Sequence, residues 1–360
     1  MSTSVHPLLR RLERARARLT EDRLEALVIL KAENRAYLTG FTGSAGIAVV
    51  LPERRHLLVD FRYVEQARME APEFPAVRVT NLVDGLAAFL RDSGAQRVGF
   101  EADTVTVAQL RRLEELAAGL AFIPLEGLDR MRWRKDPGEV ARIRRATEIA
   151  DAAFREILPA VRPEVAERDL ALELEYKMRR LGADGAAFET IVASGLRSAL
   201  PHGRASDKPI AAGDLVTFDW GAVVQGYHSD CTRTLAIGRA SEQQREIYRI
   251  VRGAQEAAVA GLRAGMTGKE ADALARDRIA AAGHAEHFGH GLGHGVGLAV
   301  HEGPTLSPRE EAVLEPDIVV TVEPGIYVPG WGGVRIEDLV VLRESGAEIL
   351  TGFSRDLLEV

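Results

Sequence analysis

The chain has 360 residues, a length that predicts two domains or one large one, and its 46% hydrophobic and 28% charged residues fit a soluble globular enzyme and exclude a disordered or fibrous protein. Because 46 Lys and Arg stand against 53 Asp and Glu, the net charge is -7, which argues against nucleic acid as the main partner. A single cysteine, Cys231, indicates a reducing compartment, so we expect a cytoplasmic protein, and no apolar run reaches the roughly 20 residues that a membrane span needs.

Residues 1–19 are rich in Arg and Leu. Arg10, Arg11 and Arg14 interrupt the apolar positions, so this segment lacks the continuous apolar core of a secretory signal. An ordinary first helix is the preferred interpretation, and a transit peptide is the alternative. The following stretch predicts strands over 26–30, 46–51, 56–60 and 97–100, and helices over 61–69, 82–92 and 106–118. This alternation predicts a mixed α/β domain.

A charged stretch over 126–137 has little apolar periodicity and ends at a proline, as is typical of a linker. Pro137 suits the first position of a helix, and the apolar positions that follow it predict a long amphipathic helix. The sequence therefore predicts one domain over 1–130 and a second over 137–360.

The second domain repeats one pattern, in which helices are followed by a strand pair. The predicted elements are helices over 167–181, 241–262 and 268–282, a strand over 188–194, and strand pairs over 215–222 with 227–237 and 318–328 with 334–342. This pattern suggests a duplicated architecture, although the two halves share no visible sequence identity.

The first strand pair carries one aspartate on each arm. A turn near residues 224–226 places Asp219 and Asp230 directly opposite or one diagonal step apart, on the same face in either case. Two like charges on one face destabilise a strand pair unless a cation compensates them. The alternative is a pair of solvated carboxylates on an exposed face.

The second strand pair repeats this arrangement with glutamates. Glu323 and Glu337 are equidistant from Gly330 in the connecting loop, so they should lie face to face between strongly apolar strands. A buried carboxylate takes up a proton unless a cation keeps it ionised. Arg335, two residues before Glu337, is the alternative partner as a plain ion pair.

Between the strand pairs lies FGHGLGHGVGLAVHEGP, which holds His290, His294 and His301 among five glycines. A phosphate-binding loop is a competing interpretation, but such a glycine run should follow a strand and open a helix. A glycine-rich surface loop without a functional role would not need three histidines. We therefore interpret this stretch as part of a metal or substrate site.

Four carboxylates and one imidazole form the candidate metal set: Asp219, Asp230, His294, Glu323 and Glu337. This oxygen-rich set suits Mn²⁺, Co²⁺ or Fe²⁺, and four negative charges are neutralised by two divalent ions. Two ions about 3.5–4 Å apart can share a water, lower its pKa and polarise a scissile carbonyl. Such hydrolysis needs no serine or cysteine nucleophile, so Cys231 is interpreted as a packing residue.

The motifs DWG…SDCTRT, HGLGHGVGLAVHE, VEPGIY and GVRIED resemble those of the pita-bread metallopeptidases, which include Xaa-Pro aminopeptidase, prolidase, methionine aminopeptidase and the metal-free creatinase. The resemblance implies a creatinase-like mixed α/β domain over 1–130 and a pita-bread catalytic domain over 137–360. The stretch YLTGFTGSAGIAVV…VDFRYVEQA is similar to the N-terminal domain of Xaa-Pro aminopeptidases, and ASGLRSALPHG resembles a bacterial Xaa-Pro peptidase subgroup.

The resemblance also implies roles for individual residues. Asp219 would bind one metal through both oxygens, Asp230 and Glu337 would bridge the two metals, and His294 would complete the second metal with Glu323. Glu323 would also carry the proton from water to the leaving nitrogen. The residues expected to position substrate and intermediate are His202, His290, His301 and Arg335. Purely structural roles are the alternatives for two of these residues. Arg335 would then only orient Glu337, and His290 would only form hydrogen bonds with backbone carbonyls.

The expected activity is that of an Xaa-Pro aminopeptidase, with two divalent metal ions. Mn²⁺ is the preferred ion, and Co²⁺, Fe²⁺ or Zn²⁺ are alternatives. The protein is expected to bind short peptides that begin Xaa-Pro and to form a homodimer. Neither nucleic acid nor a membrane is expected as a partner. The nearest rival function is prolidase, which needs the free carboxylate of its substrate to be bound by a cation such as Arg335. A more distant rival is a pita-bread protein that binds peptides without cleaving them.

Overall fold

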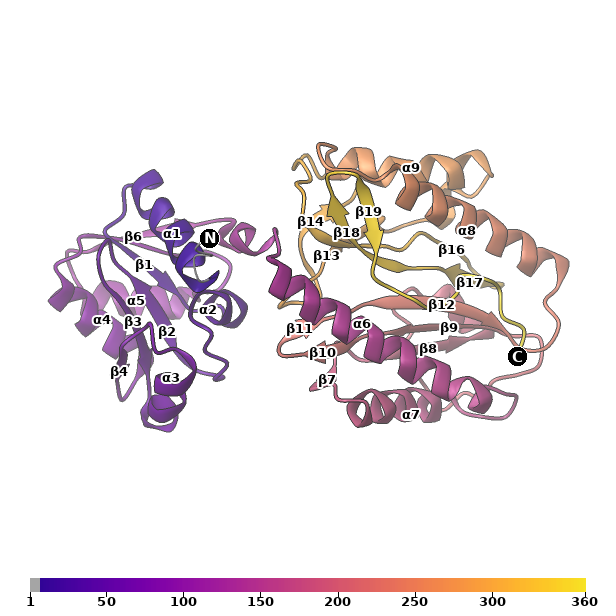
Figure 1. The fold of residues 1–360 in the computed structure, drawn as a ribbon, viewed down its shortest axis with the longest axis horizontal. Coiled ribbons are helices and arrows are strands. Elements are labelled where there is room, and N and C mark those ends of the chain that lie inside the picture. The colour runs from indigo at the N-terminus through magenta and orange to yellow at the C-terminus, as the bar shows by residue number, and fades with distance from the viewer. Residues whose placement is uncertain (1–6) are drawn as a thin grey trace, which may run out of the picture. The chain divides into compact units, whose positions relative to one another are not determined.

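The computed structural model describes residues 7–360, which divide into two compact units between Arg132 and Trp133. Figure 1 shows the elements of both units. Helix α1 (Pro7–Glu21) agrees with the predicted first helix, while the part of that prediction on residues 1–6 lies outside the described residues. Within 7–360, the helices are all too short or too polar to cross a membrane.

The first unit is built on a six-stranded mixed sheet with the strand order β4-β3-β2-β1-β5-β6. Its strands are β1 (Ala26–Ile29), β2 (Ile47–Val50), β3 (Arg55–Val59), β4 (Ala76–Arg78), β5 (Arg97–Glu101) and β6 (Ala121–Leu125). Its further helices are α2 (Ala32–Thr39), η1 (Phe61–Tyr63), α3 (Val64–Glu70), α4 (Leu82–Ser93), α5 (Val107–Leu116) and η2 (Leu128–Arg132). Helices cover both faces, because Leu27 of β1 packs with α1 to α3 whereas Val28 packs with α4 and α5. The predicted mixed α/β class is confirmed.

Four elements of this unit were not predicted: α2, β4, β6 and the short η2, which lies in the predicted linker. Helix α2 has no apolar stripe, and it is held instead by Arg35, which donates to the carbonyls of Gly43 and Gly46 at 2.6 and 2.8 Å. Strands β4 and β6 lie at the two edges of the sheet, where short strands and a proline such as Pro124 are tolerated. Local patterns cannot reveal elements that depend on such tertiary contacts.

The second unit begins with two long helices. Helix α6 (Pro137–Ile157) starts at an N-cap, Asp136, whose side chain accepts from the amide of Glu139 while the Glu139 side chain accepts in return. Pro137 occupies the first turn, as predicted. Helix α7 (Glu167–Arg180) follows, after η3 (Leu158–Ala160). The remaining helices are η4 (Gly195–Ala199), α8 (Glu242–Gly261), α9 (Gly268–Ala281) and η5 (Ala285–His287).

The strands of the second unit form two main sheets, β12-β9-β8 and β14-β13-β15-β18-β19, with two small ones, β11-β10-β7 and β16-β17. Their bounds are β7 (Gly185–Ala186), β8 (Ile191–Ser194), β9 (Leu215–Trp220), β10 (Ala222–Val224), β11 (Tyr227–His228), β12 (Cys231–Ala236), β13 (Gly293–Gly295), β14 (Glu302–Leu306), β15 (Val319–Val322), β16 (Gly325–Val328), β17 (Gly332–Arg335), β18 (Asp338–Arg343) and β19 (Gly346–Ile349).

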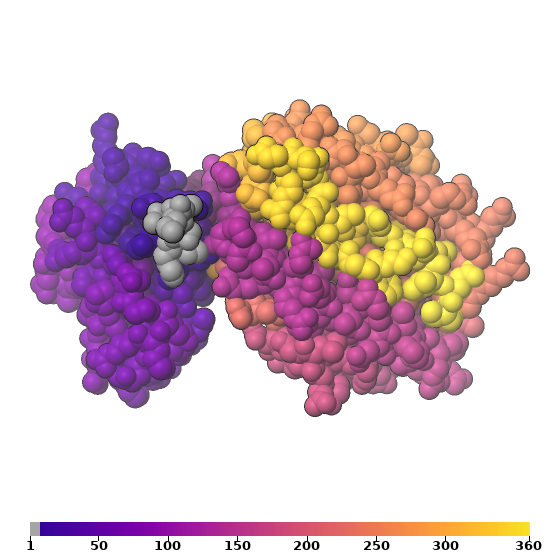
Figure 2. All heavy atoms as spheres, viewed as in Figure 1, coloured from indigo at the N-terminus to yellow at the C-terminus, as the bar shows by residue number. Residues whose placement is uncertain are grey.

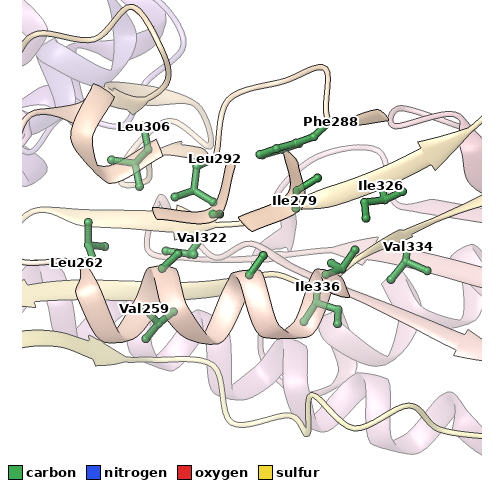
Figure 3. Packing of buried hydrophobic residues seen from close by; sticks show 14 of the residues in the cluster. Val259, Leu262, Ile279, Phe288, Leu292, Leu306, Val322, Ile326, Val334 and Ile336 are labelled. Carbon is green, nitrogen blue, oxygen red and sulfur yellow. The ribbon is translucent and has the colours of Figure 1, made fainter. Parts of the chain in front are cut away.

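Each main sheet has its own pair of helices. Phe154 of α6 stacks on Trp220 of β9 with the ring centroids 4.0 Å apart, in a core shared with α7. Helices α8 and α9 pack on the other side of the unit, where Val259 and Ile279 belong to the same buried cluster as Val322 and Ile326 (Figure 3). The helix pair followed by a sheet therefore occurs twice.

The C-terminal residues run along the surface of this unit beside α6, as Figure 2 shows in yellow and magenta. Arg155 of α6 donates to the carbonyl of Gly352 at 2.9 Å, and Arg144 pairs with Glu348. This segment thus ties the last strand back to the first helix of the unit.

The two predicted strand pairs are present, but each is interrupted. The second pair splits into β15 with β18 and β16 with β17. The interruption falls at Glu323 and Pro324, and a proline has no amide hydrogen with which to continue the ladder. The first pair is also interrupted, at Gly221 and at residues 229–230, although no proline stands there. The interruptions coincide with Asp230, Glu323 and Glu337, whereas Asp219 lies within β9.

Candidate metal centre

One cavity of about 490 Å³ in the second unit is lined by all nine residues predicted for the site. These are Asp219, Asp230, Glu323, Glu337, His202, His290, His294, His301 and Arg335. Phe188, Ile191 and Pro201 form an apolar part of the same wall. Residues separated by up to 135 positions in the sequence are therefore brought to one place by the two main sheets.

The two aspartates come from β9 and the end of the turn before β12. Asp219 pairs with Thr232 across the strands, so Asp230, two residues earlier, lies one diagonal step away on the same face. The diagonal arrangement is thus the correct one of the two that the sequence allowed. Oxygens of Asp219, Asp230 and Glu337 lie within 4.8 Å of one another, close enough to share a metal ion.

The two glutamates face each other, as their equal distances from Gly330 predicted. Val322 pairs with Asp338 and Gly325 pairs with Arg335, so the same register on both sides places Glu323 opposite Glu337. Their amides donate outside the hairpin: Glu323 donates to Leu292, just before β13, at 2.8 Å, and Glu337 donates to Thr232 of β12 at 3.1 Å. The second bond draws Glu337 against the two aspartates.

His294 reaches the carboxylates from β13. Its Nε2 lies 3.4 Å from Glu323 Oε1 and 3.7 Å from Asp230 Oδ2, while its Nδ1 lies 3.1 Å from the carbonyl of Gly295. That carbonyl can only accept, so Nδ1 carries the hydrogen and Nε2 is free to bind a metal. Burial lowers the pKa of His294, which favours this neutral form.

The strand that carries His294 is shaped for close packing. A β-bulge separates His294 from Gly295, and bulges of this kind re-aim side chains beside active sites. A side chain on Gly293 would place its Cβ 2.1 Å from the carbonyl oxygen of Thr321, and one on Gly295 would lie 2.3 Å from that of Gly303. Both positions therefore require glycine.

The carboxylates are strongly perturbed by their surroundings. Burial raises the pKa of Asp230 well above its usual range, and the charges of Glu337 and Asp219 raise it further. Burial also raises the pKa of Glu337 well above its usual range, with Glu323 and Asp219 adding to the effect. For Glu323, burial is again the main cause of a raised pKa. A bound cation is the simplest way to keep these groups ionised.

Asp219 gives a direct test of whether the pocket suits a metal. Its Oδ2 accepts from Arg335 Nη2 at 2.7 Å, whereas its Oδ1 is buried and has no hydrogen-bond partner within residues 7–360. A buried carboxylate oxygen without a partner is costly, and a cation would satisfy it. Together with the neighbouring carboxylates and the free Nε2 of His294, the donor set fits divalent metal ions.

Arg335 lies against Asp219 and not against Glu337, so the predicted alternative of a plain ion pair with Glu337 is wrong. Its Nη1 donates to the Tyr327 hydroxyl and its Nε to Thr232 Oγ1, both at 2.9 Å. Thr232 in turn donates to Glu337 at 2.7 Å. Arg335 thus reaches Glu337 only through Thr232.

Sequence reasoning overlooked the linking roles of Tyr327 and Thr232. Tyr327 stands in the VEPGIY motif, and Thr232 follows Asp230 by two positions on the same strand face, so both carried a signal. The Tyr327 hydroxyl also lies 2.9 Å from His290 Nε2. These hydroxyls connect the charged residues into one network.

The three remaining histidines differ in their surroundings. Both ring nitrogens of His290 are engaged, Nδ1 with the carbonyl of Gly291 at 2.7 Å and Nε2 with Tyr327. His202 and His301 are exposed to solvent at the cavity, and the His301 ring lies 4.3 Å from that of His294. His202 and His301 are therefore the two that stand open to a ligand.

The fold and the site now place the chain in a known class. Residues 141–344 match the model of Metallopeptidase family M24, and residues 11–133 match the Creatinase/Prolidase N-terminal domain. The chain therefore belongs to the M24 metallopeptidases. The resemblance to the pita-bread family and the two-part fold that it implied are confirmed.

Individual relatives cover nearly the whole chain. An uncharacterized peptidase of Bacillus subtilis, YqhT, is 45% identical over 97% of this chain and 99% of its own length. A solved structure of an Xaa-Pro dipeptidase from Bacillus anthracis is 44% identical with a TM-score of 0.95, covering 98% of this chain and 100% of the other. An X-Pro aminopeptidase structure from Thermotoga maritima is 41% identical with a TM-score of 0.90, over 97% and 99% of the two chains.

Proposed function

We propose that this protein is an Xaa-Pro aminopeptidase that uses two divalent metal ions, Mn²⁺ by preference, to release the N-terminal residue from peptides with proline in second position. The observation that carries the proposal is the gathering of four carboxylates and His294 around one cavity, with Asp219 Oδ1 buried and partnerless in the described chain. Two similar solved proteins whose names specify Xaa-Pro substrates support the choice of bond.

The metals would be held by Asp219, Asp230, His294, Glu323 and Glu337. When bound, divalent ions at such a site polarise a scissile carbonyl and lower the pKa of a water. Two divalent ions would supply the positive charge that the pocket needs, since one buried guanidinium faces four carboxyl groups. Arg335 orients Asp219 through its 2.7 Å bond and so presets the carboxylate for its ligand.

Glu323 is the residue proposed to move the proton. Proline's nitrogen carries no hydrogen in the peptide and leaves as an amine only after it is protonated, so a carboxyl group must stand near the scissile bond. The Glu323 side chain is held by Thr321, whose hydroxyl lies 3.2 Å from Oε1. The exposed rings of His202 and His301 would bind the substrate carbonyl and the oxygen that becomes negative during attack.

The preference for peptides over dipeptides rests on the cations of the cavity. A strict dipeptidase needs a cation for the substrate's free carboxylate, and among the described residues that line the cavity the guanidinium groups are those of Arg335 and Arg204. Arg335 is already engaged by Asp219 and Tyr327. Arg204 is 78% exposed and pairs at 3.0 Å with Glu189, which is 61% exposed, and such a pair contributes little, about 0–1 kcal/mol.

Prolidase activity remains the second candidate, because the similar protein from Bacillus anthracis is named an Xaa-Pro dipeptidase. Comparison of Ala-Pro, Ala-Pro-Ala and a longer Ala-Pro peptide with the Mn²⁺-loaded enzyme separates the two. Higher kcat/KM for the longer peptides supports the aminopeptidase, and cleavage of Ala-Pro alone overturns it. Binding of all three without cleavage would instead identify a non-enzymatic peptide-binding protein.

A further inference from the structure

Helix α9 carries an ion pair that lies outside the cavity yet contacts the segment leading into it. Arg276 Nε donates to Asp272 Oδ2 at 2.6 Å and Nη2 donates to Oδ1 at 2.8 Å, so the pair is bidentate. The Asp272 side chain is 2% exposed and that of Arg276 27%. An ordinary pair at this helical spacing is exposed and contributes only about 0.3–0.5 kcal/mol. This one is largely buried and has further partners.

Those partners are backbone groups of residues 288–292. Arg276 donates to the carbonyl of Phe288 at 2.9 Å and to that of His290 at 2.6 Å, and Asp272 accepts from the amide of Leu292 at 2.9 Å. Three alternate residues are therefore held by one pair of side chains. The Arg276 guanidinium also lies 4.3 Å from the centre of the Phe288 ring, which meets the His290 ring edge-on at 5.1 Å.

Leu292 passes this restraint on to the site. While its amide binds Asp272, its carbonyl accepts from the amide of Glu323 at 2.8 Å. The next residue, Gly293, packs so closely on Thr321 that an added Cβ would lie 2.1 Å from the Thr321 carbonyl oxygen. His290, His294 and Glu323 all depend on this segment for their positions, although neither Asp272 nor Arg276 reaches the cavity.

We propose that Asp272 and Arg276 are positioning residues, which hold residues 288–292 so that His290, His294 and Glu323 stand in the geometry required for metal binding and catalysis. This inference rests on the proposed function. Residues behind the ligands of a metal site commonly change activity or metal affinity about 10–100-fold when altered. The guanidinium is essential here because its planar fork binds Asp272 and two carbonyls at once, which a lysine ammonium cannot reproduce.

The test compares Arg276→Lys and Arg276→Met with a matched control, Arg252→Lys. Arg252 on α8 also pairs with a carboxylate four residues away, Glu256 at 2.8 Å, but it pairs in addition with Asp356 at the surface. We expect both Arg276 variants to lower kcat about 10–100-fold with little change in KM, and the control to leave both unchanged. Mn²⁺ affinity, measured by calorimetry, should fall in parallel.

Hydrogen exchange gives a readout that does not depend on activity. The amides of residues 288–294 should exchange at least about 10-fold faster in both Arg276 variants, while those of α8 and α9 keep their rates. Unchanged exchange in that segment, or wild-type kcat and Mn²⁺ affinity in a folded Arg276→Lys protein, would overturn the inference. If Arg276→Met does not fold, the lysine variant alone decides. A wild type that cleaves no Xaa-Pro peptide would refute the proposed function, and exchange and Mn²⁺ affinity would still test the positioning role.

Discussion

Glu323 and Glu337 lie directly opposite each other in one hairpin, yet their amides donate to Leu292, just before β13, and to Thr232 of β12. The hairpin opens where the two carboxylates stand, and each arm is bound to a neighbouring segment. One arm thereby approaches His294 and the other approaches the aspartates. This opening is what brings donors from both main sheets together.

Replacement of Asp230 by Asn should abolish turnover and weaken Mn²⁺ binding by more than about 100-fold, because the substitution removes a charged oxygen from the centre of the set. The metal-free variant should be at least as stable as the metal-free wild type, because repulsion with Glu337 and Asp219 is relieved. Calorimetric titration with Mn²⁺ and thermal unfolding with and without the metal provide the measurements. Full activity in this variant would contradict the two-metal mechanism.

The metal-free protein should lose stability as the pH rises. The pKa values of Asp230 and Glu337 are raised above 3.8 and 4.5, their ordinary values, so the folded chain holds these protons more tightly than the unfolded chain. Their contribution is therefore complete at low pH, declines above about pH 4–5 and is lost as the pH passes the folded values.

Urea unfolding of the metal-free wild type and of Asp230→Asn, from about pH 5 to 8, isolates this contribution. The free energy of unfolding of the wild type should fall more than that of the variant over this pH range. Saturating Mn²⁺ should abolish this difference in pH dependence. Parallel curves for the two metal-free proteins would show that the carboxylates are not coupled as described.

Tyr327→Phe should separate a catalytic effect from a structural one. The change removes the hydroxyl that joins His290 to Arg335 and should lower kcat about 10-fold, with a loss of about 1 kcal/mol in stability. Tyr248→Phe is a matched control, because Tyr248 is also buried and its hydroxyl donates to the Arg355 carbonyl at 3.1 Å. The control should lose similar stability and keep its activity; equal activity losses would argue against a specific role for Tyr327.

Arg204→Ala tests whether the cavity binds the C-terminal carboxylate of the substrate. For an aminopeptidase the kcat/KM values for Ala-Pro and Ala-Pro-Ala should change by the same factor, because the Arg204–Glu189 pair is exposed and binds no substrate carboxylate specifically. Steady-state kinetics with both peptides give the ratio. A loss of 10-fold or more confined to the dipeptide, about 1.4 kcal/mol, would assign Arg204 as a carboxylate clamp and favour the dipeptidase.

Lys135→Met should be strongly destabilising. Lys135 and Glu302 form an ion pair of 2.6 Å with both side chains 1% exposed, directly beside His301. Removal of one partner leaves a buried charge and should cost about 3–5 kcal/mol, whereas Lys135→Met combined with Glu302→Leu should recover much of that loss. Urea unfolding of the single and double variants measures both effects, and a single variant as stable as the wild type would disprove the expectation.

The register of both hairpins was predictable because strand side chains alternate with a period of two. Counting outward from Gly330 was enough to place Glu323 opposite Glu337, and the same logic placed Asp230 on the face of Asp219. The long helix after Pro137 was equally predictable, since a proline in the first turn and an apolar stripe are local signals. Local pattern therefore accounts for the placement of the carboxylates.

What could not be predicted depends on contacts between distant segments. At the interruption of the second hairpin, Glu323 and Glu337 donate to Leu292 and Thr232, which belong to distant segments of the chain. In the sequence, Asp272 and Arg276 resemble any solvated ion pair at helical spacing. Only the fold shows that they form hydrogen bonds with the backbone of residues 288–292. Helix α2 was overlooked for the same reason, because Arg35 holds it from within the core.

The close approach at Gly293 and Gly295 limits how this protein can vary. One added methyl group at either position would collide with a carbonyl of a neighbouring strand and wedge the sheet apart beside His294. Steric collision thus excludes other residues at the positions on either side of His294, whether or not catalysis is under selection. A saturation library of residues 292–296 should return glycine at both positions, even when it is screened only for soluble protein.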